Sequence, residues 1–411
     1  MMLLPFILAT LGLQPAPQPT FAMIVREQYV TWDRNADGLL DPAEIDAVCV
    51  DPAIQGPQAA AAAALKRIVR SGRYEVPPLT LENLTATTKP PTRPTTDAQA
   101  DREDSSENAA PASAPKPAPN FQSSFASSLR RISAAKRDLF LDDTPDLDRL
   151  RQGALGNCFL VASIGAMVHR DSQSVVGMIT PRDEGGYTVR FGDGQRVEIG
   201  PLTDAELALS GTTGDEGLWL PVLEKAVGSL RRDANPQRYT TELATDAIAN
   251  GGSTATMIRL LTGHSTDRIT LKRRPRGADA STPPTPASDV ETMAGRVRDR
   301  VSAALAEQRL VTAGTGTEPQ PPGINGKHAY AVLAFDADAD TLTLWNPHSN
   351  SFTPKGAPGL TTGYATRRGM FAVPIPEFVQ IFTSVVIEAP PAKPAPPDAS
   401  PPASDAPPSG S

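Results

Sequence analysis

The sequence is poor in the residues from which disulfide scaffolds and metal centres are built. It contains two cysteines and four histidines in 411 residues. Two cysteines cannot form a disulfide-rich scaffold or a cysteine-rich zinc module, which needs three or four suitable ligands. Four histidines leave few places for a histidine-based metal site. The same scarcity leaves only eight Cys–His pairs that could supply a thiol nucleophile and its base.

The chain also lacks an excess of positive charge and a long apolar segment. Its net charge is −7, which argues against a nucleic-acid partner. The apolar run Leu3–Leu13 is too short to span a bilayer, which takes about 20 residues, so no stable membrane insertion is expected. This run is followed by Thr20-Phe21-Ala22, which predicts a signal peptide over residues 1–22 and a secreted or periplasmic protein. A start of translation at Met23 would instead leave the protein in the cytoplasm.

Proline is abundant, with 42 residues, and it divides the chain. Residues 86–120 and 389–411 are rich in proline and have no aromatic residues, so we predict a disordered linker and a disordered tail. A small unit over residues 23–85 and a long globular region over 121–388 remain. We expect the protein to be a monomer.

A twelve-residue segment of the small unit, Asp33–Glu44, has the pattern of a calcium-binding loop. A hard cation takes six or seven oxygen ligands, and an EF-hand loop supplies them at fixed positions between two helices. Gly38 allows the sharp turn that such a loop needs. The predicted calcium ligands are Asp33, Asn35 and Asp37, the carbonyl of Leu39, Asp41 through a water, and Glu44.

The segment that begins at Gln152 places a cysteine before a wholly apolar stretch. The residues after Cys158 predict a buried helix with the thiol at its N-terminus, where free N–H groups favour a thiolate. Gln152 could turn its amide toward the same place and form an oxyanion hole with the Cys158 backbone N–H. The other cysteine, Cys49, lies on an apolar stripe and is expected to be a small core residue.

Residues 328–345 predict a hairpin with a turn over residues 336–340. With the turn centred near Asp338, His328 faces His348; with the centre at Ala337, His328 faces Asn346. Both registers keep His328 and Asn346 on one face of the sheet. A histidine beside an asparagine suits a thiol nucleophile, because the imidazole takes the proton and the amide fixes its tautomer. His348 is the alternative base.

These segments resemble the calpain family of papain-fold cysteine proteases. Gln152–Ile164 is similar to the active-site motif Q-G-x-L-G-D-C-W-L-L-A-A-I, Lys327–Val332 to the histidine strand G-H-A-Y-S-V, and Trp345–Pro347 to R-N-P-W-G. Further similar segments, in the order of the family, are Leu218–Ala226, Gly251–Thr254, and Gly369–Phe371 with Phe378. The resemblance covers roughly residues 125–388.

The resemblance implies an α+β, papain-like fold with two lobes, preceded by an α-helical EF-hand unit. The first lobe, residues 121–263, would supply Cys158 and Gln152, and the second, residues 264–388, His328 and Asn346. The implied activity is that of a calcium-dependent type of cysteine endopeptidase, which hydrolyses a protein or peptide substrate through a Cys158 thioester. The EF-hand unit, joined by a flexible linker, would be a tethered stability or docking element.

The sequence departs from the family pattern at five positions. Asn157, Phe159 and His348 stand where the family has Asp, Trp and Trp, and Lys327 and His264 occupy glycine positions that line the family's substrate cleft. These changes leave two alternatives open. One is a catalytically inactive module that binds peptides, and the other is a thiol acyltransferase similar to transglutaminases.

Overall fold

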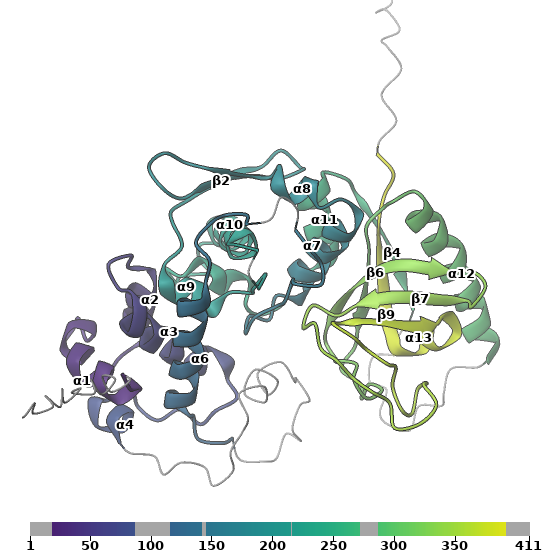
Figure 1. The fold of residues 1–411 in the computed structure, drawn as a ribbon. Helices are drawn as coiled ribbons and strands as arrows, with labels where there is room; N and C mark the ends of the chain where they lie inside the picture. Colours follow the sequence, from purple (N-terminus) through teal and green to yellow (C-terminus); the bar gives the residue numbers. More distant parts are fainter. Residues whose placement is uncertain (1–18, 87–115, 142–144, 215, 272–286, 392–411) are drawn as a thin grey trace, which may run out of the picture.

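The computed structural model describes residues 19–86, 116–141, 145–214, 216–271 and 287–391. They form a small helical unit, a helical lobe with a short sheet, and a lobe built on a larger sheet (Figure 1). The predicted α+β class is therefore confirmed. Most of the predicted linker and tail lies outside the described residues. Within those residues, no helix is both long and apolar enough to cross a bilayer.

The N-terminal unit consists of two helix–loop–helix pairs. Their helices are α1 (Phe21–Trp32), α2 (Pro42–Val50), α3 (Gly56–Ser71) and α4 (Leu81–Thr85). The two loops touch, because Leu40 N–H donates to the Leu79 carbonyl at 3.2 Å. Asp41, the residue after Leu40, caps α2, and Thr80, the residue after Leu79, caps α4. The segment before α4 is thus a partner for the acidic loop, without that loop's ligand residues.

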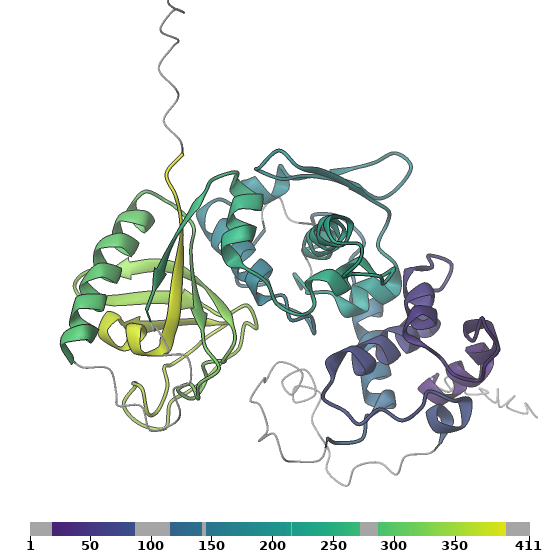
Figure 2. The same cartoon turned by 180° about the vertical axis from the view of Figure 1, so that it is seen from behind.

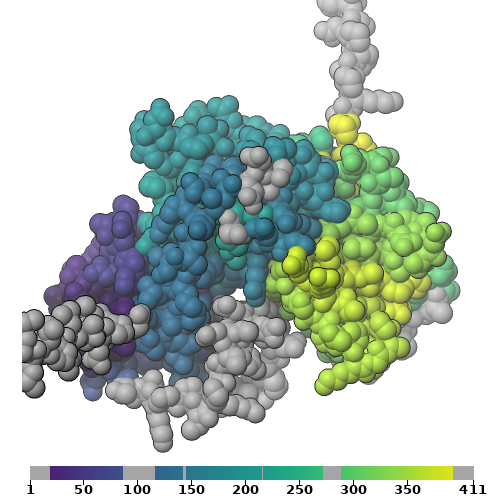
Figure 3. Space-filling view, in the orientation of Figure 1, coloured from purple at the N-terminus to yellow at the C-terminus, as the bar shows by residue number. Residues whose placement is uncertain are grey.

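The N-terminal unit packs directly against the helical lobe, which differs from the tethered arrangement that we expected (Figure 3). All six alanines of the run Ala59–Ala64 in α3 are at most 1% exposed. They belong to one apolar core that includes Phe125 of α6 (Phe121–Ala134) and Leu209 of α9 (Asp204–Leu209). Alanine side chains let helices approach closely, so a surface of this composition is suited to a permanent contact.

Polar contacts cross the same boundary. Lys66 of α3 forms ion pairs with Asp46 of α2 and with Asp246 of the 3₁₀ helix η1 (Ala244–Ile248), and the Lys66 side chain is only 7% exposed. The Thr203 hydroxyl donates to the Cys49 carbonyl at 2.6 Å. Removing one partner of a buried ion pair destabilises a protein much more than breaking an exposed ion pair does. These contacts therefore hold the N-terminal unit in place.

The buried helix α7 (Cys158–Arg170) lies on the side of the helical lobe that faces the second lobe (Figure 2), and further elements complete the helical lobe. These are α6, α8 (Gln173–Val176), α9, α10 (Trp219–Ala234), η1 and α11 (Thr254–Thr262), with the antiparallel sheet β1 (Ile179–Pro181), β2 (Tyr187–Arg190) and β3 (Arg196–Ile199). Every residue of α7 from Phe159 to Val168 is buried, as the apolar run predicts.

The second lobe is an antiparallel sheet in the order β4-β9-β5-β6-β7-β8. Its strands are β4 (Thr266–Thr270), β5 (Val311–Thr315), β6 (Ala329–Asp336), β7 (Thr341–Trp345), β8 (Met370–Pro374) and β9 (Phe382–Glu388). Alternate residues of β6 divide between two cores. Ala331 and Leu333 join the core of α7, and Tyr330 and Val332 join that of α12 (Ala287–Ala306) and α13 (Ile375–Ile381).

The two lobes are also joined at the C-terminal end of α7. The buried Glu388 carboxylate at the end of β9 accepts hydrogen bonds from the Arg170 guanidinium at 2.9 Å and from Leu310 N–H at 2.7 Å. Its other oxygen lies 2.6 Å from Nδ1 of His264. All available oxygens of this buried charge are therefore engaged, as such a group requires.

The predicted signal-peptide boundary at Ala22 falls inside α1. Thr20 caps this helix, and the Phe21 ring is 2% exposed and stacks on Phe121 with centroids 5.1 Å apart. Phe21 N–H donates to Gln122 Oε1 at 2.8 Å. The folded unit thus begins before residue 22, whereas the apolar run Leu3–Leu13 lies outside the described residues.

We predict that a chain beginning at Pro19 is more stable than one beginning at Met23. The shorter chain loses the Phe21 ring from the shared core, which costs about 3 kcal/mol, and the Thr20 cap, which costs about 1 kcal/mol. Urea unfolding of both chains measures the difference, and Phe21→Ala in the longer chain should reproduce most of it. Equal midpoints for the two chains would contradict the placement of Phe21.

Candidate active site

Cys158 is the first residue of α7, as predicted, and its side chain is partly exposed. It lines a cavity of about 290 Å³, which we call the Cys158 cavity. The wall of this cavity comes from both lobes and from the N-terminal unit: Arg73, Gln152–Gly156, Cys158, Ala249–Gly251, Lys327, His328 and His348. The structure therefore brings Cys158, Gln152 and His328 to one cavity.

The backbone before Cys158 is held against the segment after η1. Gly156 N–H donates to the Ala249 carbonyl at 2.9 Å, and Gly251 N–H donates to the Gly156 carbonyl at the same distance. A Cβ at Gly156 would lie 2.4 Å from the Ala249 oxygen, so only glycine allows this approach. The start of α7 is thus fixed by the main chain.

Gln152 is buried and its amide is oriented by two contacts. Its backbone N–H donates to the Pro347 carbonyl at 2.8 Å, which joins it to the residue after Asn346. Its Nε2 donates to the Leu155 carbonyl at 2.6 Å. An amide nitrogen carries two hydrogens, so one donor remains for the cavity.

His328 and Asn346 are hydrogen-bonded side chains. His328 Nε2 lies 2.8 Å from Asn346 Oδ1, and both groups are buried. Because Asn346 Oδ1 can only accept a hydrogen bond, the ring proton is assigned to Nε2, and Nδ1 is able to take a proton. Burial lowers the pKa of His328 to about 4, against the opposing effect of the bond to Asn346, so the imidazole is neutral at pH 7.

The strand pairing explains this contact. At the cavity end of the hairpin, Ala331 pairs with Trp345 and Val332 with Leu344, which is the register centred near Asp338. A bulge between Val332 and Ala334 shifts the pairing nearer the turn. In this register His328 lies opposite His348, and the hydrogen bond to Asn346 runs diagonally.

His348 stacks on His328 instead of acting in its place. The ring centroids are 4.6 Å apart and the planes differ by 15°. His348 N–H donates to Asn346 Oδ1 at 3.0 Å, whereas its ring Nδ1 is buried and has no partner. Burial holds the pKa of His348 well below its usual range, and the charges of His328, Arg151 and Arg73 lower it further. His348 thus covers the imidazole and helps to orient the asparagine.

Asn157 and Phe159, the altered neighbours of Cys158, point away from the Cys158 cavity. Asn157 Nδ2 donates to Glu224 Oε1 at 2.8 Å, and Gly211 N–H donates to Oε2 of the same carboxylate at 2.8 Å. Burial raises the pKa of Glu224, and these hydrogen bonds lower it in part. Phe159 is buried beneath the Arg231 guanidinium, 5.2 Å from the ring centroid. Neither residue lines the cavity.

The other singled-out residues divide between the cavity and the rest of the protein. Lys327 lines the Cys158 cavity and has a φ of 49°, a conformation that favours the glycine of the family motif. His264 lies beside Glu388 near the opposite end of α7 and does not line the Cys158 cavity. Cys49 is a free, fully buried core residue, as expected.

Sequence reasoning missed two residues at this site. The Asn325 side-chain oxygen accepts a hydrogen bond from Asn346 Nδ2 at 2.9 Å and so fixes the amide that orients His328. Arg73, which follows α3 in the N-terminal unit, contributes to the cavity wall. Neither lies in a recognisable motif, because each acts through a contact between distant parts of the chain.

The acidic loop joins α1 and α2, as predicted, and Gly38 has a φ of 81° at its turn. Asp33 accepts hydrogen bonds from the backbone of Asp37 and Gly38, and Glu44 Oε1 from that of Arg34 and Asn35. The carboxylates at both ends thus turn toward the loop. Within the described ranges, no three Asp, Glu, His or Cys side chains are grouped closely enough to hold a metal ion.

Replacing Asn157 by Asp, the residue of the family motif, is predicted to make stability depend on pH. Two buried carboxylates would then face each other, so the folded state would bind an extra proton with a raised pKa. The extra proton stabilises the folded state at low pH. This contribution is lost as pH rises, so the free energy of unfolding falls by about 2 kcal/mol between pH 5 and 8. Urea unfolding of Asn157→Asp and wild type at several pH values measures this. The double variant Asn157→Asp/Glu224→Gln should abolish it, and a penalty that is the same at every pH would contradict the contact.

Comparison with known proteins gives a family match. A family model described as calpain family cysteine protease matches residues 122–356, more than half of the chain, and the matched range contains Cys158, His328 and Asn346. A search of curated proteins finds no match. The chain therefore belongs to the calpain family of cysteine proteases.

Proposed function

We propose that the protein is a cysteine endopeptidase in which Cys158 is the nucleophile, His328 the general base and Asn346 the residue that orients the base. The observation that carries this proposal is the hydrogen bond between His328 Nε2 and Asn346 Oδ1 beside the cavity that Cys158 lines. It leaves Nδ1 as the proton acceptor. A thiol at a helix N-terminus with such an imidazole in the same cavity suits acyl transfer.

The proposed reaction proceeds through a thioester. The Cys158 proton passes to His328 Nδ1, and the sulfur attacks the carbonyl carbon of the scissile peptide bond. His328 then gives the proton to the leaving amine as the C–N bond breaks. Water, deprotonated by His328, attacks the thioester and releases the carboxylic acid, and the proton returns to the thiol.

Gln152 would stabilise the negative oxygen that forms during both attacks. One hydrogen of its Nε2 is engaged by the Leu155 carbonyl, which leaves the second for the oxyanion, together with the Cys158 backbone N–H. The amide is buried and already oriented, so it need not reorganise during the reaction.

The arrangement supports a papain-like fold with two lobes. Cys158 begins a helix of the helical lobe, and His328 and Asn346 flank a strand pair of the other lobe. Peptide would bind between them.

Both alternatives remain distinguishable by experiment: an inactive module would bind peptide without cleavage, and an acyltransferase would pass the acyl group to an amine. The altered residues Asn157 and Phe159 do not favour the first, because neither faces the cavity.

An epoxide peptide inhibitor is predicted to label Cys158. The thiolate opens the epoxide, so mass spectrometry should find the label in wild type and in Cys49→Ala but not in Cys158→Ala. Peptide hydrolysis by Cys158→Ala should fall by at least about 10³-fold, because the nucleophile is lost.

Three results would decide against the proposal. Labelling that survives in Cys158→Ala excludes this residue as the nucleophile. Peptide binding without labelling or hydrolysis, with and without calcium, indicates a binding module. Incorporation of an amine that outpaces hydrolysis indicates an acyltransferase.

We also propose that the loop Asp33–Glu44 binds calcium through the six ligands named above. The chemistry of the donors fits a hard cation, and Gly38 has the backbone conformation that the loop needs. The carboxylates of Asp33 and Glu44 already face the loop, where they accept backbone hydrogen bonds. A bound cation would neutralise part of their charge and stabilise the N-terminal unit.

Isothermal titration of the full chain with calcium is expected to give a Kd of about 10⁻⁴ to 10⁻³ M, the range of extracellular modules. Glu44→Gln should weaken binding by about tenfold or more, because one ligand charge is lost while the helix cap is retained. The matched control is Glu27→Gln, an exposed carboxylate on α1 outside the loop. Absence of binding at millimolar calcium would refute the site.

A further inference from the structure

One buried carboxylate of the helical lobe has no part in the reaction proposed above. Glu224 lies in α10, is fully buried, and does not line the Cys158 cavity. Its Oε1 accepts a hydrogen bond from Asn157 Nδ2, and its Oε2 accepts one from Gly211 N–H in the segment 210–212, both at 2.8 Å. A buried carboxylate is tolerated only when it is hydrogen-bonded. Here the two bonds join segments that are far apart in the sequence, and each segment leads to the active site.

The first of these segments is the start of α7. Asn157 is fully buried, and its carbonyl accepts the first hydrogen bonds of the helix, from Leu160 N–H at 2.9 Å and from Val161 N–H at 3.1 Å. This carbonyl and the Cys158 N–H belong to one planar peptide group, so an orientation that is fixed for one is fixed for the other. Because the Asn157 side chain is held by Glu224, the carboxylate helps to set the direction of the Cys158 N–H, one of the two proposed oxyanion donors.

The second segment packs against the residues on both sides of Gln152. Arg151 N–H donates to the Thr212 carbonyl, and Thr212 N–H donates to the Arg151 carbonyl, each at 2.8 Å. A Cβ at Gly153 would lie 2.3 Å from the Ser210 oxygen, so only glycine allows this approach. The segment therefore holds the backbone of Gln152, whose amide is the other proposed oxyanion donor.

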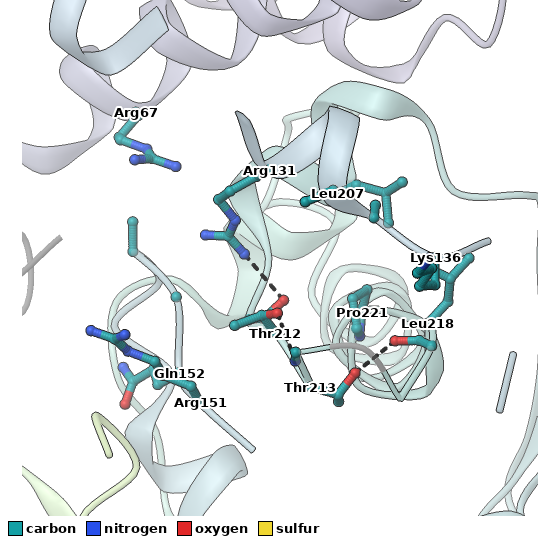
Figure 4. A pocket seen from close by; sticks show the side chains of 17 residues that line it. Arg67, Arg131, Lys136, Arg151, Gln152, Leu207, Thr212, Thr213, Leu218 and Pro221 are labelled. Carbon is teal, nitrogen blue, oxygen red and sulfur yellow. Dashed lines mark hydrogen bonds between the residues drawn. The ribbon is translucent and has the colours of Figure 1, made fainter. Parts of the chain in front are cut away.

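Gly211 is the point at which this segment meets α10 and α6. A Cβ at Gly211 would lie 3.0 Å from both the Arg151 carbonyl oxygen and Glu224 Oε1. Arg131 of α6 donates to the Gly211 carbonyl at 3.2 Å, and Figure 4 shows its guanidinium pointing toward the segment beside Thr212. Burial raises the pKa of Glu224, and its two hydrogen bonds and the Arg131 charge lower it in part. The carboxylate and the segment thus belong to one buried polar cluster.

The two anchored points are the ends of one short loop, residues 152–157. The loop contains Gly153 and Gly156, and glycine permits a wide range of backbone conformations, so the loop's own sequence does not fix the distance between its ends. Glu224 reaches both ends, directly at Asn157 and through the segment 210–212 at the other end. A single side chain of α10 therefore holds the two ends at a set separation.

We propose that Glu224 is a positioning residue that sets the separation and direction of the two oxyanion donors, the Cys158 N–H and the Gln152 amide. The proposal rests on the function proposed above. Donors that are already placed where negative charge develops stabilise the transition state without reorganisation, and losing one such donor costs about 10²- to 10³-fold in kcat. Displacing both donors slightly should cost less than that. Glu224 would thus act on the reaction through two other residues, without touching the substrate.

Two variants of similar size separate the hydrogen bonds of Glu224 from its volume. Glu224→Met offers only a weakly accepting sulfur, so Asn157 Nδ2 and Gly211 N–H both lose their acceptor. Glu224→Gln can keep the bridge, because its Oε1 accepts from Gly211 N–H and its Nε2 donates to Asn157 Oδ1 after that amide turns over. Asn157 Oδ1 is buried and makes no hydrogen bond in the structure, so turning the amide breaks no bond of this oxygen.

Three measurements distinguish displaced donors from a general loss of structure. In Glu224→Met, kcat for peptide hydrolysis should fall by about tenfold or more, while KM changes by less than about threefold. The affinity for a peptide aldehyde should fall by a similar factor, because its adduct with the Cys158 sulfur places an oxygen at the same donors. Alkylation of Cys158 by iodoacetamide forms no such oxygen, so its rate at the alkaline plateau should stay within about threefold of wild type. Glu224→Gln should resemble wild type in all three.

Glu206→Met is the matched control for the loss of a buried carboxylate. Glu206 is buried in the same lobe but contacts Thr203 and Lys225. This variant should lower the midpoint of urea unfolding and leave the kcat of the folded protein unchanged. If Glu224→Met does not fold, Asn157→Ala removes one half of the bridge by a smaller change, and it should show the same loss of kcat and aldehyde affinity with unchanged alkylation.

Three outcomes would overturn the proposal. They are an unchanged kcat in Glu224→Met, an alkylation rate that falls as far as hydrolysis does, and a loss in Glu224→Gln as large as that in Glu224→Met. If the wild type hydrolyses no peptide, the proposed function is refuted instead. The aldehyde affinities of the wild type and Glu224→Met then decide on the donors alone: equal affinities overturn the role of Glu224, and a loss of about tenfold supports it.

Discussion

The candidate site depends on the packing of α7 against the sheet of the second lobe. Gly165, in the middle of this helix, lies against the Trp345 ring, and a Cβ there would come within 2.5 Å of the indole. Trp345 directly precedes Asn346, and the paired strand β6 follows His328. A helix that carries the thiol therefore contacts the strands that carry its partners. Any residue larger than glycine at position 165 would push the two halves of the site apart.

The N-terminal unit is part of the same construction. Six alanines make the face of α3 that packs on the helical lobe apolar. The buried ion pairs of Lys66 lie at the same boundary. The segment after α3 then reaches the Cys158 cavity through Arg73. Asp246, which pairs with Lys66, lies three residues before Ala249, and Ala249 holds the turn before Cys158. Calcium in the first loop would therefore bind to a body that already forms one wall of the cleft.

Local features of the structure could be predicted from the sequence to a large extent. The apolar run after Cys158 predicts α7, and the pattern over 328–345 predicts β6, β7 and two possible registers, of which the structure has the one centred near Asp338 at the cavity end. These features depend on periodicity within one segment. The bulge after Val332 could not be predicted, since it reflects how the hairpin meets its neighbours in the sheet.

Features that join distant segments escaped prediction. An alanine run indicates a helix but does not name its partner, so the docking of α3 on α6 and α9 was not foreseen. The hydrogen bond of Asn325 to Asn346 and the pairing of His264 with Glu388 likewise join residues that no motif connects. The signal-peptide boundary predicted at Ala22 stays a prediction, and in the structure it falls inside α1, directly after the buried Phe21. Small residues suit both a cleavage site and a helix start, so the sequence pattern alone does not distinguish them.

The contacts of Glu388 fix the point about which α7 can rotate relative to the second lobe. They fix the Arg170 end of α7 to β9, whereas Cys158 lies at the other end of a helix of 13 residues, about 18 Å away. A rotation of roughly 3° between the lobes about this anchored end would move the sulfur by about 1 Å relative to His328. Displacements of that size decide whether reacting atoms are aligned. Because the thiol lies far from the anchored end of α7, a rotation too small to disturb the packing still moves the sulfur enough, relative to His328, to affect the reaction.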